Sequence, residues 1–576
     1  MLIKNFNIKK MKFNKSKLIL VFYLIYMSKS LLPNDEPVES EQEFRGVWVS
    51  PWGGDQSLIE FETQDEFIKR MTYILDTLKM YNMNAIIYHV RTHNDALYKS
   101  KINPVSPYFS KVDFDKFNPL KWMIEESHKR GIDFHAWMNP YRIKSTNQIS
   151  IDEIISKYKD YDNPANDKNC ILNGTNTLIM DPGLEKVRNF IWETINEFLG
   201  QFDVDAIHFD DYFYCDMGAG GKTEGNVTIL DEPDQNTYEE YIKNNPECNY
   251  DSKNAKDKAN WRREQVDLLI KMLHENINDY NKKNNKKVQF GISPTGIYKN
   301  GDGVVTYDQN NNAITTGSET KGQEHFASYL FCDTLKWVNN GWINYILPQS
   351  YWAQDHPLAH YQKVMGWWNK VVEFKNVNLF SGIGLYMADL TGNTYGWKNN
   401  SNELYEDLIY VSQSKNIDGV SIYNFDTLRR LRDGKETMSA TQVKNGVKVW
   451  KMRVPLPEIK SYVRIKLEKP QNLKFENKQL SFNKINGAKF YIVYKSKENI
   501  LFKNEEIIDI FGSYDDVVNW VESEEGDFNY GIKGLSYSNT LGEGATLNSR
   551  DDSSSDSNHL SMGIISYILM MIFLLL

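Results

Sequence analysis

The chain alternates between short apolar runs and longer segments in which apolar residues recur every three or four positions. The short runs are rich in β-branched and aromatic residues and are bounded by Gly, Pro or Asn, which predicts β-strands. The predicted strands cover residues 44–51, 84–91, 132–140, 205–212, 288–296, 345–352, 378–386 and 418–425.

Amphipathic segments separate these strands and predict helices, because apolar residues at offsets of three and four line one helical face. Phe67, Met71, Ile74 and Leu78 form such a stripe in the first segment. The predicted helices cover residues 65–81, 120–129, 185–202, 261–280, 335–340, 360–374 and 402–415. This alternation predicts an α/β fold, a (β/α)8 TIM-type barrel. A doubly wound open sheet is disfavoured because no Gly-rich phosphate turn follows the first strand.

The pattern changes near residue 454, where short alternating strands such as AKFYIVYK begin to dominate. They predict a small all-β sandwich domain after the barrel. We expect a linker at 31–43, the barrel at 44–453, a second linker at 454–470 and the sandwich at 471–548. Polar insertions at 215–258 and 300–324 are expected to wall a groove, because long barrel loops usually bind or cover substrates.

Both ends of the chain carry the pattern of a processing signal. Residues 1–30 place a Lys-rich segment before a short apolar core, which predicts a secretory signal peptide. Residues 549–576 join a polar spacer to an apolar tail, which predicts a GPI-anchor signal or a membrane-inserted tail. We therefore expect an extracellular, cell-surface protein of the secretory pathway, anchored to the membrane at its C-terminus.

Composition narrows the function. A net charge of −9, with no basic run outside the leader, disfavours nucleic acid as a partner. The four cysteines have no CxxC spacing, so neither a disulfide scaffold nor a zinc site is expected. A Cys215–Cys248 bridge would brace the insertion after the fourth strand in a secreted protein. Aromatic residues make up 13% of the chain, and we expect most in the core and some along a sugar groove.

The segment Asp205–Tyr214, DAIHFDDYFY, is the most informative stretch. An apolar run ends there in two adjacent acids, and buried carboxylates are costly unless they are paired. Barrel active sites lie at the carboxyl ends of the strands, so the polar and aromatic residues at those ends are the candidates. They are Trp52, Arg91, Asp95, His135, Asn139, Arg142, Asp210, Asp211, Gln349, Tyr351 and Trp352.

Acids, amides and aromatic rings together suit glycoside cleavage. One carboxylic acid protonates the leaving oxygen, and a second carboxylate acts as nucleophile or as base for water. Adjacent strand residues face opposite sides, so one acid of the pair is expected to face the groove and the other to brace a neighbour. We expect Asp211 as nucleophile or base, with Asp210 second. Asp95, Asp355 or Asp389 is the candidate proton donor.

Each candidate also has a purely structural interpretation. A lone strand histidine such as His135 or His208 is more often a core residue than a catalyst. Arg91 and Arg142 would serve equally well in an ion-pair network, and the tryptophans in packing at the barrel rim. No HExxH or His-x-His spacing is present, so we expect no metal and no cofactor. The oligomeric state is left open.

Ordered sequence blocks resemble the glycosyl-hydrolase-like 10 family over roughly Glu43–Arg430. The blocks are FRGVWVSP, VRTHNDALYKSKINPVSPY, HAWMNPYR, MDPG, DAIHFDDYFY, FGISPTGIY, ILPQSYW and GVSIYNF. The resemblance implies a (β/α)8 glycoside hydrolase, and some bacterial members act on peptidoglycan strands stripped of peptides. It places the family's polar positions on Arg91, Asp95, Asn139, Arg142, Asp210, Asp211, Gln349 and Tyr351. The C-terminal strands resemble a fibronectin type III module.

The leading hypothesis is a secreted, surface-anchored glycoside hydrolase that cleaves a polysaccharide, such as the glycan strands of peptidoglycan. Arg91, Asn139 and Gln349 would orient hydroxyls, while Trp52, Tyr351 and Trp352 would stack on sugar rings; Arg142 and His135 complete the predicted binding set. The alternative is a catalytically silent carbohydrate-binding surface protein that keeps the groove but lacks one acid. A metal-dependent deacetylase is disfavoured because no ligand cluster is visible.

Overall fold

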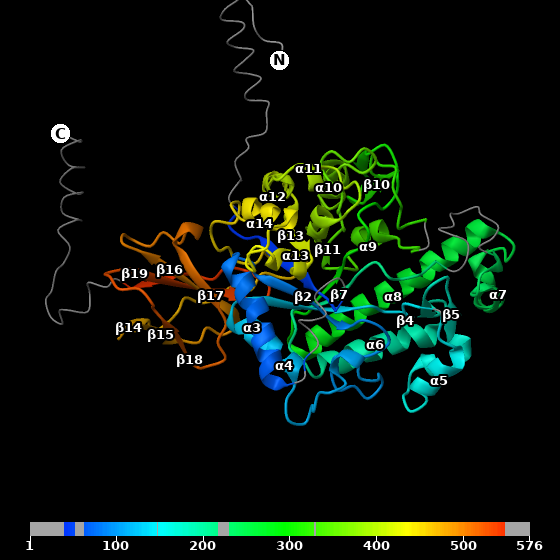
Figure 1. The fold of residues 1–576 in the computed structure, drawn as a ribbon, viewed down its shortest axis with the longest axis horizontal. Coiled ribbons are helices and arrows are strands. Elements are labelled where there is room, and N and C mark those ends of the chain that lie inside the picture. Colours follow the sequence, from blue (N-terminus) through cyan, green and yellow to red (C-terminus); the bar gives the residue numbers. More distant parts are fainter. Residues whose placement is uncertain are drawn as a thin grey trace, which may run out of the picture.

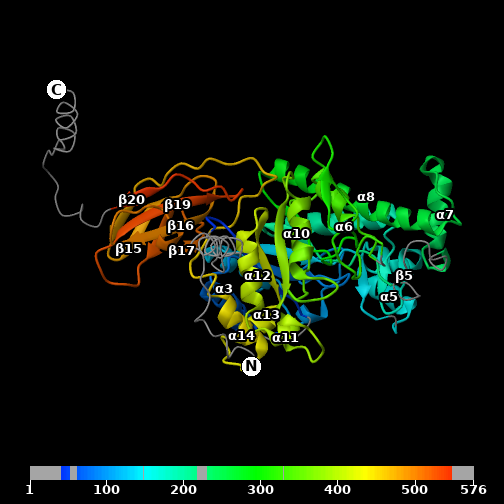
Figure 2. The ribbon, with the colours of Figure 1, turned by 90° about the horizontal axis from the view of Figure 1, so that it is seen from above.

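The computed structural model describes residues 40–51, 61, 63–146, 148–216, 230–327 and 330–547. A central barrel carries a C-terminal β domain at one end and a lobe of helices and short strands at the other (Figure 1). The view from above places the same two parts at opposite ends (Figure 2). The predicted signal peptide, the C-terminal tail from residue 549 and Trp52 lie outside the described residues.

Eight parallel strands close into a barrel in the order β1-β13-β12-β11-β8-β7-β3-β2. The strands are β1 (Phe44–Val49), β2 (Ala85–Arg91), β3 (Asp133–Met138), β7 (Ala206–Phe209), β8 (Gln289–Ile292), β11 (Tyr345–Ile346), β12 (Asn378–Gly384) and β13 (Ile417–Tyr423). The ring closes because β1 pairs in parallel with both β13 and β2. The predicted (β/α)8 TIM-type barrel is confirmed, and each predicted strand overlaps one of its eight strands.

Helices cover the barrel and follow the predicted stripes. They are α3 (Gln64–Met80), α4 (Pro119–Lys129), α6 (Glu185–Leu199), α8 (Ala255–Asn284), α9 (Thr334–Asn340), α10 (Tyr361–Val371) and α12 (Glu403–Gln413). The Thr63 side chain caps α3 by accepting a hydrogen bond from the Glu66 backbone N–H at 3.2 Å. Phe67, Met71 and Leu78 of α3 are buried in the main hydrophobic core.

Shorter elements complete the fold around these units. They are α11 (Gly396–Asn399), α13 (Phe425–Arg429), α14 (Met438–Gly446) and the hairpin β9 (Val305–Tyr307) and β10 (Ala313–Thr315). The hairpin occupies the predicted insertion at 300–324, which is therefore ordered by its own antiparallel pairing.

Large aromatic side chains fill the inside of the barrel. Phe44, Trp48, Tyr345 and Phe380 form a buried cluster there. Gly291 lets the Tyr345 ring cross strand β8, because a Cβ at Gly291 would lie 1.9 Å from that ring. The barrel is thus a packed core rather than a pore, and ligands have access only at its mouth.

A lobe extends beyond the carboxyl ends of β3 and β7. It contains α5 (Ile151–Tyr158), α7 (Gln235–Asn244) and a sheet of β4 (Arg142–Lys144), β6 (Leu178–Met180) and β5 (Ile171–Asn173). A buried ion cluster braces it: Arg262 contacts Asp234 at 2.6 Å and Glu232 at 2.7 Å, and Lys258 contacts Asp234 at 2.8 Å. Both cations lie on α8, which begins several residues before the predicted position.

The C-terminal region forms two antiparallel sheets. One contains β14 (Lys474–Glu476), β15 (Gln479–Asn483) and β18 (Val517–Val521); the other contains β17 (Ile507–Phe511), β16 (Ala488–Ser496), β19 (Asn529–Ser536) and β20 (Ala545–Leu547). Buried residues of both sheets share one cluster, in which the Phe482 and Tyr491 ring centroids lie 5.1 Å apart. This arrangement fits the predicted small all-β domain.

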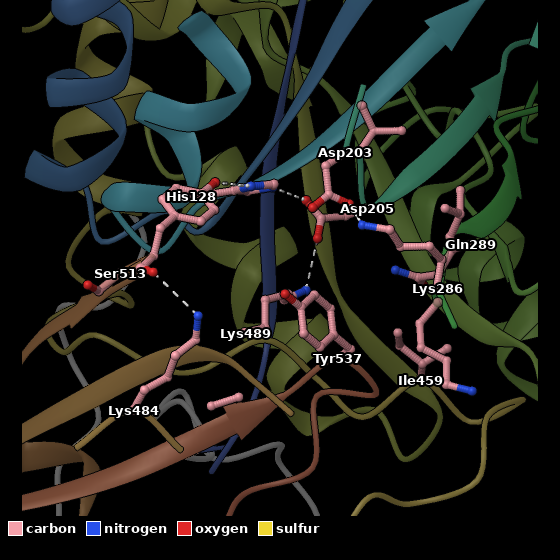
Figure 3. Close-up of a pocket in the computed structure, with 16 residues that line it drawn as sticks. His128, Asp203, Asp205, Lys286, Gln289, Ile459, Lys484, Lys489, Ser513 and Tyr537 are labelled. Carbon is pink, nitrogen blue, oxygen red and sulfur yellow. Dashed lines mark hydrogen bonds and ion pairs between the residues drawn. The ribbon is translucent and has the colours of Figure 1, made fainter. Parts of the chain in front are cut away.

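This β domain docks on the amino-terminal end of the barrel through buried charges. Lys489 Nζ lies 2.7 Å from Asp133 Oδ1 and 3.2 Å from Asp205 Oδ1. His128 Nε2 lies 2.8 Å from the other Asp205 oxygen. Figure 3 shows Lys489 and His128 on either side of Asp205, in a small cavity of about 70 Å³ between the two domains. The β domain therefore closes the bottom of the barrel.

Residues 454–470, expected as a linker, run across the same end in close contact with the strands. Pro455 O accepts a hydrogen bond from Glu43 N at 2.9 Å. Ser461 Oγ accepts one from Asn344 Nδ2 at 2.7 Å, and Lys460 pairs with Asp418 at 2.7 Å. The barrel and the β domain are consequently joined by a packed segment.

The four cysteines, all within the described part of the chain, are free thiols, so the considered Cys215–Cys248 bridge is absent. None of the helices in the described ranges is long and apolar enough to cross a bilayer.

Candidate active site

The two adjacent acids lie directly after β7, at the mouth of the barrel. Asp210 is buried, with 3% of its surface exposed, whereas Asp211 is half-buried. β7 lies between β3 and β8, so the acids are flanked by the residues that end those strands. The structure therefore places Asp210 and Asp211, the most informative residues of the sequence, at the usual position of a barrel active site.

Asp210 is held by donors from neighbouring segments. The amide nitrogen of Asn139 lies 2.8 Å and 2.9 Å from its two carboxyl oxygens, and the Tyr212 backbone N–H donates to Oδ1 at 3.2 Å. Burial raises the pKa of Asp210, while the Arg142 charge and the Asn139 hydrogen bonds act in the opposite direction. The Arg142 charge and the Asn139 hydrogen bonds therefore favour the ionised form of Asp210, whereas burial favours the protonated form.

A histidine behind Asn139 fixes the direction of its amide. His89 Nε2 lies 2.6 Å from Asn139 Oδ1, and His89 Nδ1 lies 3.2 Å from Ser50 Oγ. Burial lowers the pKa of His89 well below its usual value, so the ring is neutral. Its Nε2–H then donates to Asn139, and the Asn139 NH2 group is directed at Asp210 rather than the amide oxygen.

Asp211 is the group in the site with a pKa near neutrality. Burial and the adjacent charge of Asp210 raise the pKa of Asp211 to about 7. Arg142 and a hydrogen bond with the Gln349 side chain oppose this rise. Two carboxyls that repel each other lose their protons in sequence, so Asp210 ionises first and Asp211 retains a proton.

Arg142 and Tyr212 form one side of the site. The guanidinium carbon of Arg142 lies 3.5 Å from the centroid of the Tyr212 ring, which is a close cation–π contact. Tyr212 is 47% exposed, so its ring presents a free edge to solvent. This pair holds a positive charge close to both acids and offers an aromatic surface beside them.

Three half-buried tyrosines form the opposite side. The rings of Tyr351 and Tyr423 are stacked with centroids 5.9 Å apart, and Tyr386 meets both rings edge-on at 5.8 Å and 5.7 Å. The pKa of Tyr386 is raised by burial and by the charge of Asp211, which places its hydroxyl within reach of that acid's field. Aromatic faces with hydroxyl tips suit sugar rings.

The predicted residues Arg91 and Asp95 lie behind this surface. Arg91 is buried and donates to Asn94 Oδ1 at 2.5 Å and to the backbone oxygens of Asn139 and Pro140. Asp95 is buried and accepts from the His93 backbone N–H at 3.3 Å. Arg91 holds the segment that carries Asn139, Asp95 shapes the loop after β2, and neither residue hydrogen-bonds to the acid pair.

His135 does not reach the strand ends. It lies deep in the barrel, where its Nδ1 is 2.9 Å from the Tyr345 hydroxyl, and its side chain is 1% exposed. His135 is the third residue of β3, close to the start of the strand. Inward side chains at that level fill the interior of the barrel, so the ring cannot reach the mouth. His135 is therefore a core residue, and its predicted role in binding substrate is not supported by its position.

The other two candidate proton donors are also held elsewhere. Asp389 pairs with Arg430 and accepts from the Ser439 backbone N–H at 3.0 Å. Asp355 accepts from Gly396 N at 2.7 Å.

Trp352 is half-buried and packs over Gly296 at the rim of the barrel. A Cβ on Gly296 would lie 2.8 Å from the Trp352 ring.

Sequence reasoning missed His89 as a member of the site, whereas Tyr386 and Tyr423 are found at the predicted strand ends but were not chosen among the candidate site residues. His89 is a polar residue in the apolar run AIIYHVR, and strand alternation places it on the same face as Ile87, which points into the barrel. Tyr386 ends the predicted strand at 378–386 and Tyr423 lies near the end of the one at 418–425, so their positions at strand ends were the signal for both. No group of three or more metal-binding side chains occurs in the part of the chain that the structure describes.

Comparison with known proteins agrees with this architecture. The profile of the family described as Glycosyl hydrolase-like 10 matches residues 43–396. Glycosyl hydrolase YngK of Bacillus subtilis is 33% identical over 359 residues, which are 60% of this chain and 62% of YngK. Glycosyl hydrolase DigH of Escherichia coli O6:H1 is 30% identical over 363 residues, which are 60% of this chain and 74% of DigH. The chain thus spans less than two thirds of YngK.

Among solved structures, the catalytic domain of β-amylase from Paenibacillus polymyxa aligns with a TM-score of 0.41 and 11% identity, over 71% of this chain and 99% of that one. The family match covers more than half of the sequence and includes the acid pair with both of its flanking strands. The chain therefore belongs to the glycosyl hydrolase-like 10 family.

Proposed function

We propose that the protein is a glycoside hydrolase that cleaves O-glycosidic bonds of a polysaccharide at the mouth of the barrel. The observation that carries the proposal is the acid pair itself: Asp210 is held as a carboxylate by Asn139, and the pKa of Asp211 is raised to about 7. A carboxyl with such a pKa can donate a proton at neutral pH. The tyrosines and Arg142 supply a surface for sugar rings.

In this mechanism Asp211 protonates the leaving oxygen, a role that differs from its expected role as nucleophile or base. The reason is that burial and the charge of Asp210 together keep the proton on Asp211. Gln349 contacts Asp211 and is placed to orient it. Family membership supports the reaction class, and glycan strands of peptidoglycan are the proposed substrate.

Cellular placement belongs to the same proposal. The leader at 1–30 and the tail at 549–576 support secretion and anchoring at the cell surface through the C-terminus. The β domain would then act as a spacer of the fibronectin type III kind between barrel and membrane. A protease-protection assay on intact cells tests this: digestion of the barrel without permeabilisation is expected, and full protection contradicts it.

A catalytically silent carbohydrate-binding protein is the second candidate. The observation in its favour is that Asp95, Asp355 and Asp389 are all engaged away from the acid pair. Binding without turnover would be its signature.

The deciding experiment is a screen of purified protein against a glycan panel that includes denuded peptidoglycan strands. Cleavage is expected for the wild type, with a loss of about 10²-fold or more in kcat/KM for Asp211→Asn. Asp115→Asn, at a highly exposed surface acid, is the matched control and should retain full activity. Binding of strands with no product from any glycan supports the silent binder instead.

A further inference from the structure

The acid pair poses a chemical question about the nucleophile. When a hydrolase uses two carboxyls of its own, they bracket the anomeric carbon at about 5–5.5 Å for retention or about 6.5–9.5 Å for inversion. Groups that bracket a sugar come from different strand ends. Asp210 and Asp211 are consecutive residues directly after β7, so this pair does not come from two different strand ends.

Asp210 is poorly arranged to attack carbon. Both of its oxygens contact the Asn139 amide, and Oδ1 also accepts from the Tyr212 backbone N–H. Two donors, the Asn139 amide and the Tyr212 backbone N–H, tie the carboxylate to the wall and withdraw charge from it. Of these bonds Oδ2 accepts only the one from Asn139, so this oxygen has a lone pair for a further hydrogen bond. Its setting is that of a fixed acceptor for an N–H group.

We infer that the nucleophile is supplied by the substrate, as the carbonyl oxygen of an acetamido group on C2 of the sugar that is cleaved. Asp210 would accept the N–H of that group, and Asp211 would serve as the acid and later the base. This inference rests on the proposed function and specifies its substrate class: glycans with 2-acetamido sugars on the non-reducing side of the bond.

The steps balance without any further reactant. The acetamido oxygen forms a bond to C1 while the bond from C1 to the leaving oxygen breaks, and Asp211 gives its proton to that oxygen. Asp210 takes up the hydrogen of the amide, so a neutral five-membered oxazoline forms. Water then adds to C1 as Asp211 removes its proton, and the proton on Asp210 returns to nitrogen as the acetamido group is restored. The product retains its anomeric configuration.

The surroundings of the pair fit this arrangement. Burial is the main cause of the raised pKa of Tyr351 and of Tyr386, and the charge of Asp211 contributes to both. Their rings meet edge-on at 5.8 Å, so they form one aromatic surface near that acid. Trp137, whose side chain favours the ionised form of Asp210, is stacked on His89 at a centroid distance of 3.8 Å. Its indole ring gives the acetyl methyl group an apolar wall beside Asp210.

His89 and Asn139 act as positioning residues in this account. His89 fixes the Asn139 amide, and the amide holds Asp210 in place for the substrate N–H. Asn139→Asp would put a third carboxyl against Asp210 and raise the pKa of both acids. We expect its activity to fall and the acid limb of the kcat/KM profile to move to higher pH, which a loss of packing alone would not do.

The test uses one polymer with two acyl groups. Denuded glycan strands are N-deacetylated and then re-acylated with either acetyl or trifluoroacetyl groups, and the full-length enzyme is assayed on both. Fluorine withdraws electrons from the carbonyl oxygen, so kcat on trifluoroacetylated strands is expected to be at least about tenfold lower. NMR of the first product should show the retained anomer, and Asp210→Asn should show a smaller difference between the two strands.

The outcomes separate the inference from the proposed function. Equal kcat on both strands, or an inverted product, overturns the substrate-supplied nucleophile while leaving a glycoside hydrolase. Cleavage of a polymer without acetamido groups, such as a β-glucan, overturns it in the same way. Failure to cleave any glycan removes the proposed function and the inference together. Re-acetylated strands, compared with untreated ones, control for chemical damage.

Discussion

The two ends of the barrel hold buried carboxyls in opposite electrostatic settings. At the bottom, burial opposes ionisation, but Lys489 and His128 outweigh it and hold the pKa of Asp205 well below its usual range. At the mouth, burial and the charge of Asp210 together raise the pKa of Asp211 to about 7. The same residue type is therefore a fixed anion at one end and a proton carrier at the other.

The difference lies in the neighbours. A buried acid that meets a cation forms a stable charge pair, and removing either partner is costly. A buried acid that meets another acid must keep a proton, which costs stability but leaves a group available for chemistry. The bottom of the barrel thus joins the two domains, while the mouth carries the candidate reaction.

The largest expected effect comes from matched changes of one acid at each end. Asp210→Asn should lower kcat/KM by about 10²–10⁴-fold, because the acceptor of the reaction is lost, while unfolding stays close to wild type. Asp205→Asn should leave activity per folded molecule unchanged and lower the unfolding free energy by on the order of 3 kcal/mol. Steady-state kinetics and thermal unfolding of both variants check this; the reverse pattern contradicts the comparison.

Replacement of the central cation at the bottom should have the next effect. Lys489→Met leaves Asp133 and Asp205 buried without their cation and should cost about 3–5 kcal/mol. Chemical denaturation measures this. Lys466→Met, at a well exposed pair with Glu543, is the control and should change stability by less than about 1 kcal/mol. An equal effect of the two variants would show that the buried cluster has no special role.

A smaller effect is expected behind the acid pair. His89→Gln retains a donor toward Asn139 but loses the ring that stacks on Trp137. We expect about a tenfold loss of kcat, with KM nearly unchanged, because the amide that holds Asp210 is less well fixed. His135→Gln, at the core histidine, should reduce stability without a specific effect on kcat. Kinetics and unfolding on the same samples separate these results.

The smallest effect concerns pH at the bottom of the barrel. Burial alone would lower the pKa of His128, but Asp205 outweighs it, so the pKa of the folded state is raised. The stabilisation is fully present below the unfolded-state pKa of about 6.5 and is lost as pH rises through the raised value. His128→Gln should therefore cost about 1 kcal/mol at pH 6 and almost nothing at high pH. A constant difference from pH 6 to 9 would contradict this linkage.

Much of the architecture could be predicted because it depends on the pattern of apolar and polar residues within short segments. Buried parallel strands need apolar runs, and the helices that cover them need one apolar face, so each barrel strand was visible before the structure. The apolar run that ends at Phe209, together with the two acids that follow it, also predicted the position of the candidate site. These features depend only on residues close together in the sequence.

The partners of the acids could not be predicted, because they are set by closure of the fold. Lys489 meets Asp205 across 284 residues, and nothing near either residue indicates the pairing. His89 reaches Asn139 only because β2 and β3 are neighbours in the barrel. The same holds for the start of α8: its first turns are polar, which predicts a loop, and they are stabilised by ion pairs of Lys258 and Arg262 with Asp234. Charge pairs of long range thus decide which acids are structural and which are free to react.

The central claim is that burial and the charge of Asp210 together keep a proton on Asp211, and a carboxyl titration tests it most directly. Protein labelled with ¹³C at the aspartate carboxyls is titrated by NMR as wild type and as Asp210→Asn, with Asp211→Asn used to assign the signal. The account predicts a pKa of Asp211 of about 7 in the wild type and a clear fall in Asp210→Asn. An ordinary acidic pKa in the wild type, or the same raised pKa in both proteins, would contradict it.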